Sequence, residues 1–98
     1  MTFIQTMEFT TDDKDKMLEV GGRWAGDAIS SGTAQRGILA EDRSSPGRYV
    51  WTVFFDSAED AAKNNERPET GTYAEAFGAL TTARIAFREY DVVEVHGD

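Results

Sequence analysis

The chain has 98 residues, of which 40% are hydrophobic and 29% charged, a composition typical of one globular domain and unlike disordered or membrane-embedded chains. Its 18 acidic and 10 basic side chains give a net charge of −8, which disfavours nucleic acid and anionic membranes as partners. The sequence contains no cysteine, which excludes disulfides, thiolate nucleophiles and cysteine-ligated metal centres.

The N-terminal residues carry neither the basic segment nor the apolar run of a signal peptide. No apolar stretch approaches the ~20 residues that a membrane span needs. We therefore expect a cytoplasmic protein.

Residues 3–9 alternate in polarity and predict a strand, and residues 10–13 supply capping groups for a helix that ends near Ser30. Two apolar stripes of this helix are possible. One runs through Met17, Gly21, Trp24 and Ala28, and the other through Leu18, Gly22, Ala25 and Ile29. The glycine pair inside the helix indicates either a close approach to the backbone or a local kink.

Residues 33–42 and 48–56 predict two strands of a hairpin, joined by a loop at residues 43–47. Both faces of the second strand are apolar. Tyr49, Trp51, Val53 and Phe55 share one face, and Val50, Thr52 and Phe54 the other. The helices of so short a chain can cover one face, so we expect a second copy to cover the other in a homodimer.

Ser57 and Asp60 form a capping-box pattern at the start of a second helix. Pro68 is expected to break that helix, with a second helical segment following residues 70–72. Residues 83–95 predict a last strand whose apolar phase slips, which favours a bulge near Arg88 and Glu89.

The order strand, helix, strand, strand, helix, strand predicts an α+β fold, the ferredoxin-like β-α-β-β-α-β plan with a four-stranded antiparallel sheet. We expect residues 1–98 to form a single domain of this kind. With its second sheet face covered by another subunit, the pattern resembles the dimeric α/β barrels.

The segment from Arg48 to Ala61, RYVWTVFFDSAEDA, resembles the strand and helix start of the antibiotic-biosynthesis-monooxygenase-like family. That resemblance implies a pocket between the sheet and the helices. Its implied lining combines an aromatic set with polar groups able to meet a flat ligand, namely Gln5, Tyr49, Trp51, Phe55, Asn64 and Tyr73.

The family's haem-degrading branch places an Asn, a Trp and a His around the porphyrin, and the matching positions here hold Gln5, Asn64 and Tyr73. The resemblance therefore implies no haem and no other cofactor. His96, the only histidine, lies next to the chain end, so we expect it to be solvated and to build no metal site.

Two interpretations of function stay open at this stage. The first is a small-molecule-binding protein that resembles cofactor-independent monooxygenases acting on aromatic or polycyclic substrates. The second is a non-catalytic dimeric interaction or accessory module with a filled core. The volume of the implied pocket discriminates between them.

Overall fold

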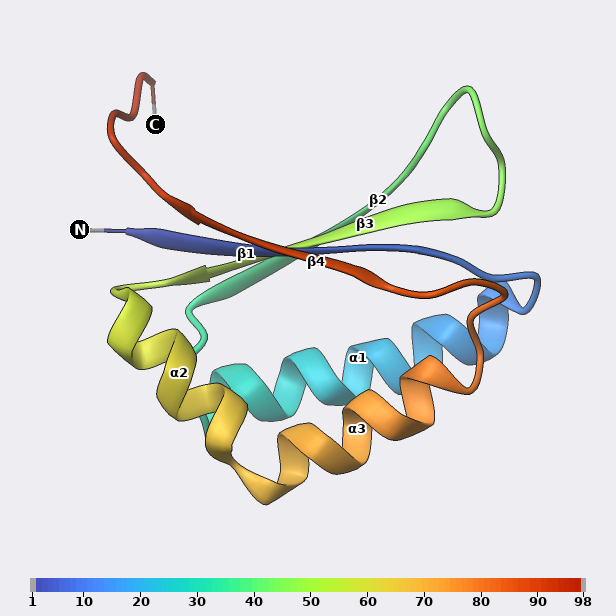
Figure 1. Cartoon of the computed structure of the whole chain (residues 1–98), viewed down its shortest axis with the longest axis horizontal. Helices are drawn as coiled ribbons and strands as arrows, with labels where there is room; N and C mark the ends of the chain where they lie inside the picture. Colours follow the sequence, from blue (N-terminus) through green and yellow to red (C-terminus); the bar gives the residue numbers. More distant parts are fainter. Residues whose placement is uncertain (1, 98) are drawn as a thin grey trace.

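A computed structural model describes residues 2–97. Four strands form one antiparallel sheet in the order β2-β3-β1-β4. The elements in chain order are β1 (Phe3–Thr10), α1 (Lys14–Ser30), β2 (Arg36–Glu41), β3 (Arg48–Phe55), α2 (Ala58–Glu66), α3 (Pro68–Gly78) and β4 (Ala86–Asp91). All three helices lie on one face of the twisted sheet (Figure 1). The predicted ferredoxin-like α+β fold is confirmed.

The strand register assigns each side chain to one of two sheet faces. Gln5 pairs with Val53 and with Glu89, and Met7 pairs with Trp51 and with Phe87. Because side chains alternate along a strand, these residues share the face that the helices cover, here called the inner face. The opposite, outer face carries Ile4, Ile38, Val50, Phe54 and Tyr90 among its apolar residues.

Helix α1 begins after Asp13, whose Oδ1 accepts a hydrogen bond from Lys16 N at 3.2 Å. Of its two possible stripes, the one through Met17 and Ala28 faces the sheet, whereas Leu18 on the other stripe is exposed. The helix runs unbroken through its glycine pair. A Cβ atom on Gly21 would lie 3.2 Å from Phe77 Cε1, so close packing rather than a kink accounts for this glycine. Gly22 has open space around it.

The hairpin turns at Gly47, whose φ of +91° favours glycine. Gly47 N donates to Glu41 Oε2 at 3.1 Å, and this hydrogen bond is the main cause that lowers the pKa of the Glu41 carboxyl. Strand β2 is shorter than the predicted 33–42, whereas β3 agrees closely with the prediction.

The second helical region is broken as predicted. Ser57 Oγ accepts from Asp60 N at 3.1 Å, which caps α2, and Arg67 adopts an extended backbone before Pro68. The second segment begins earlier than predicted. Pro68 occupies the first turn of α3, where its missing N–H costs nothing, so residues 70–72 are helical.

The predicted bulge in the last strand is wrong. Residues 86–91 of β4 pair with β1 without interruption, from Ala86 opposite Glu8 to Asp91 opposite Phe3. All six β4 residues are exposed, because β4 is an edge strand paired on one side only. The positions of the apolar side chains along β4 therefore do not mark one buried face of the strand. The strand ends at Asp91 rather than at residue 95, since β1 begins at Phe3.

The core beneath the inner face has two parts. One contains the large side chains of Met7, Phe9, Met17, Tyr49 and Phe77. The other contains Phe3 and Phe55 with three alanines, Ala28, Ala34 and Ala61. Within residues 2–97, no helix is long and apolar enough to cross a membrane.

Candidate functional site

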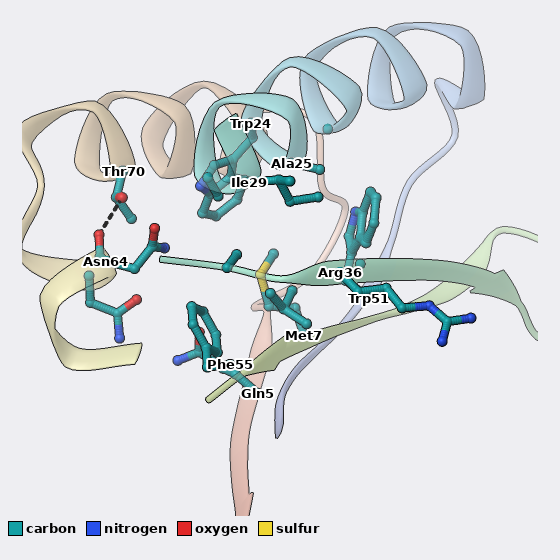
Figure 2. Close-up of a pocket in the computed structure, with 16 residues that line it drawn as sticks. Gln5, Met7, Trp24, Ala25, Ile29, Arg36, Trp51, Phe55, Asn64 and Thr70 are labelled. Atoms are coloured by element: carbon teal, nitrogen blue, oxygen red, sulfur yellow. Dashed lines mark hydrogen bonds between the residues drawn. The ribbon is translucent and has the colours of Figure 1, made fainter. Parts of the chain in front are cut away.

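A narrow cavity of about 50 Å³ lies between the inner face and helices α1, α2 and α3, beside the alanine-rich part of the core. Figure 2 shows Trp24, Ala25 and Ile29 of α1 on one side and Gln5, Met7 and Phe55 of the strands on the other. The full lining comprises Gln5, Met7, Gly21, Trp24, Ala25, Ala28, Ile29, Ala34, Arg36, Gly37, Trp51, Val53, Phe55, Asn64, Asn65 and Thr70.

A wider recess of about 410 Å³ adjoins this cavity beside α3 and β4. The cavity and the recess share Gln5, Met7, Trp24, Asn65 and Thr70. Gly71, Ala74, Phe87, Arg88 and Glu89 complete the recess. Together the two spaces form one site, here called the cleft.

The cleft is apolar with amide and hydroxyl groups at intervals. Arg36 contributes to the lining, but its guanidinium extends away from the other labelled side chains (Figure 2) and lies 5.8 Å from the centre of the Phe54 ring. Arg88 Nη1 pairs with Glu8 Oε2 at 3.8 Å on the outer face. The only carboxylate among the lining residues is Glu89, at the recess.

Asn64 is the most buried polar side chain of the cleft, with 5% of its surface exposed. Its main-chain oxygen accepts from Thr70 Oγ1 at 2.6 Å and from Arg67 N at 3.3 Å, which fixes the backbone at the end of α2 (Figure 2). Its side-chain Oδ1 is buried and has no hydrogen-bond partner within residues 2–97. A buried amide oxygen of this kind is costly unless a ligand or a water molecule meets it.

Trp51 occupies a slot bounded by two glycines. A Cβ atom on Gly37 would lie 3.2 Å from Trp51 Cζ3, and one on Gly21 would lie 3.4 Å from Trp51 Nε1. Side chains at these positions would press on the indole. The glycines therefore let the Trp51 ring approach the backbones of β2 and α1 closely at the wall of the cleft.

The structure brings together four of the six predicted site residues, because Gln5, Trp51, Phe55 and Asn64 line the cavity. Tyr49 and Tyr73 are not among the lining residues of the cleft. Tyr49 stacks on Phe9 in the core, with ring centres 5.6 Å apart. Burial, followed by the nearby Glu41 carboxylate, raises the pKa of the Tyr49 phenol.

Sequence reasoning did not assign Thr70, Asn65 or the alanines of α1 to the site. Alanine at helical spacing is typical of packed core, and only the neighbouring side chains reveal that Ala25 and Ala28 border a space. Thr70 was assigned to a connection between helices, although it lies in the first turn of α3 and faces Asn64.

His96 is exposed and pairs with Glu94, with 3.1 Å between Nε2 and Oε1. It belongs to the segment after β4 and takes no part in the cleft. In the described part of the chain, no group of three His, Asp or Glu side chains is placed to hold a metal ion.

No protein-family model and no curated protein matches the sequence. Solved structures do match over nearly the whole chain. SnoaB, a cofactor-independent oxygenase from Streptomyces nogalater, superposes in a variant form with a TM-score of 0.88 at 16% identity, over 99% of this chain and 98% of that chain.

Rv0793 from Mycobacterium tuberculosis superposes with a TM-score of 0.83 at 13% identity, over 99% of this chain and 100% of that chain. A structure of an antibiotic biosynthesis monooxygenase gives 0.78 at 13% identity, over 96% and 100%. The chain therefore shares the fold of the antibiotic biosynthesis monooxygenase proteins, which confirms the predicted resemblance at the level of the fold.

Proposed function

We propose that the cleft binds a flat aromatic molecule, and that the protein acts on it as a cofactor-independent oxygenase. The observation that carries this proposal is an apolar space walled by Trp24 and Trp51, with the side-chain amides of Gln5 and Asn64 in its lining. Indole rings offer a flat apolar surface, and convergent amides fix a ligand's orientation.

The volumes indicate how such a ligand would lie. The inner cavity of about 50 Å³ accepts only the edge of a ring system, whereas the recess of about 410 Å³ has room for the remainder. A ligand placed in this way crosses the boundary between the two spaces, where Gln5, Trp24 and Thr70 border both.

The lining also constrains the chemistry. A deprotonated dihydroxyaromatic substrate can itself give an electron to O₂, after which the two radicals form a C–O bond. The resulting hydroperoxide loses water and leaves a carbonyl, so that one ring C–H and one phenol C–OH, with O₂, become two quinone carbonyls and H₂O. The protein then supplies orientation and stabilises the phenolate charge. The phenol proton of the substrate is transferred to Glu89 or to water, since the lining residues include no other base.

A blocking variant with a matched control tests this site. Gly71 borders the recess and Gly22 does not, yet a Cβ atom at either position meets nothing within 4 Å. With acetylnaphthalene as the probe, we expect Gly71→Phe to weaken binding at least tenfold in an NMR titration and Gly22→Phe to leave it unchanged.

Equal binding by both variants, or no binding by the unaltered protein, would contradict the proposal and favour a non-catalytic accessory module. Mass spectrometry of small molecules extracted from protein purified out of its native host then identifies the aromatic class. Oxygen consumption with a dihydroxyaromatic of that class tests the reaction, with Gly22→Phe again as the control.

We also propose that a second copy of the chain covers the outer face. The helices lie on the other side of the sheet (Figure 1), and Ile38 and Tyr90 on the outer face are 41% and 47% exposed. Apolar side chains gathered on one sheet face are typical of an interface between identical subunits.

Two matched variants test the homodimer by sedimentation equilibrium. Ile38 on the outer face and Leu18 on α1 are aliphatic residues of similar exposure, at 41% and 45%. We expect a dimer for the unaltered protein and for Leu18→Glu, and a monomer for Ile38→Glu. A monomeric unaltered protein at micromolar concentration would overturn the proposal.

A further inference from the structure

Arg67 lies at the extended junction between α2 and α3 and is not among the lining residues of the cleft. Its Nη2 is 3.1 Å from Asp27 Oδ2 near the end of α1 and 3.4 Å from Glu69 Oε2. The Arg67 side chain is 18% exposed and that of Asp27 23%, unlike the other, more exposed ion pairs of the described residues. This ion pair therefore fixes the junction to α1.

Gly32 marks the point where the side chains of Arg67 and Asn64 converge. A Cβ atom on Gly32 would lie 2.7 Å from Arg67 Nη1 and would overlap Asn64 Oδ1. Both atoms are buried, and neither has a hydrogen-bond partner within residues 2–97. A Cβ atom there would also lie 2.7 Å from the Ala28 main-chain oxygen, so the backbone at the end of α1 requires a glycine at position 32 as well.

The charge of Arg67 decides which end of the Asn64 amide faces it. A guanidinium carries donors only, so an amide oxygen is attracted to it and an amide NH₂ group is repelled. Oδ1 therefore turns toward Gly32 and Arg67. The other end of the amide, Nδ2, then faces the cleft that Asn64 lines and can act as a donor there. Unlike Oδ1, it is not a buried atom without a hydrogen-bond partner.

We propose that Arg67, anchored by Asp27, is a positioning residue that orients Asn64 so that Nδ2 donates to an acceptor oxygen of the ligand. The inference rests on the proposed function of the cleft and narrows its ligand class to aromatics with a carbonyl or phenolate oxygen. Arg67 is not a lining residue, so it acts only through Asn64.

Two probes of nearly the same shape, one with an acceptor oxygen and one without, measure the contribution of the hydrogen bond from Nδ2. Acetylnaphthalene has a carbonyl oxygen where isopropenylnaphthalene, substituted at the same ring position, has a methylene group. By NMR titration we expect the unaltered protein to prefer the acetyl probe about fivefold, the range of one hydrogen bond. The Asn64 side-chain NH₂ signals, assigned by their loss in Asn64→Ala, should shift with the acetyl probe and not with the other.

The double variant Arg67→Met with Asp27→Asn removes both charges of the half-buried pair, and the Glu69 carboxylate that also loses Arg67 is 50% exposed to water. We expect it to bind both probes equally, at the affinity that the unaltered protein has for isopropenylnaphthalene. Arg67→Lys keeps a positive charge and should recover part of the preference. Arg23→Met, which breaks an exposed ion pair on α1, is the matched control and should leave the preference unchanged.

A fivefold preference that persists in the folded double variant would overturn the inference, and so would an equal loss of both affinities. If the double variant does not fold, Asp27→Asn alone decides: a preference reduced at least twofold supports the positioning role, and an unchanged one contradicts it. Equal binding of both probes by the unaltered protein refutes this inference but not the proposed function. Binding of neither probe refutes both.

Discussion

The two parts of the core show how one layer between sheet and helices can be closed at one end and hollow at the other. Phe9, Tyr49 and Phe77 fill one end, where Phe9 and Phe77 meet edge to face with ring centres 4.8 Å apart. Ala28, Ala34 and Ala61 belong to the other end, where Ala28 and Ala34 line the cavity. The small side chains of Ala25, Ala28 and Ala34 border the cavity at this end. We expect the filled end to supply stability, and the hollow end is where we propose the site.

The filled end is expected to be the more sensitive to truncation. Phe77 is fully buried and contacts both Phe9 and Trp24. Phe77→Ala should lower the free energy of unfolding by about 3–5 kcal/mol, because it removes apolar contact and leaves a cavity. Urea denaturation measures the loss. A loss below about 1 kcal/mol would mean that this end is not tightly packed.

The adjacent glycines Gly21 and Gly22 of α1 should respond in opposite directions to the same substitution. Gly22→Ala should raise the free energy of unfolding by about 0.5–1 kcal/mol, since the site is open and alanine favours the helix. Gly21→Ala places a Cβ atom 3.2 Å from Phe77 Cε1, on a ring that cannot retreat, and should lower it by about 1–3 kcal/mol. Thermal unfolding of the two variants measures these changes. Equal effects on the free energy of unfolding would contradict the close packing of Phe77 on Gly21.

The hollow end should tolerate a larger side chain and lose its ligand. Ala25 borders the cavity and is only partly buried. Ala25→Leu should change the free energy of unfolding by less than about 1 kcal/mol, because the added atoms enter empty space. Acetylnaphthalene affinity should fall at least tenfold in the same variant. Retained affinity with unchanged stability would place the ligand elsewhere.

A smaller effect concerns the pH dependence of the filled end. The pKa of Tyr49 in the folded chain is raised above the ordinary value of about 10, so folding favours the protonated phenol. The contribution of Tyr49 is complete below about pH 10 and is lost as pH rises through the folded pKa. Stability should therefore fall more steeply above pH ~10 in the unaltered protein than in Tyr49→Phe. Parallel profiles would contradict a buried phenol.

The sequence predicted the fold well because its signals are local and agree with one another. The period of two in residues 48–55, the cap at Ser57 and the break at Pro68 each specify an element without knowledge of its neighbours. The last strand was predicted poorly, because an exposed edge strand such as β4 has no buried face to set its phase.

The cleft was predicted only in part, for a physical reason. Gln5, Trp51, Phe55 and Asn64 lie where the strand phase and the family resemblance place them. Tyr49 shares the sheet face of Trp51 and Phe55, yet it faces the filled end. The alternation along a strand identifies a face, but it does not identify which part of that face the helices cover with large side chains.

The most direct test of the hollow end as the site is a map of amide chemical-shift changes on addition of acetylnaphthalene. We predict that the largest changes fall on the indole N–H of Trp24 and on the side-chain amides of Gln5 and Asn64, all of which line the cleft. The backbone amides of Met17 and Tyr49 in the filled end should stay nearly unchanged. Changes that centre on Met17 and Tyr49, or that are absent throughout, would contradict the account.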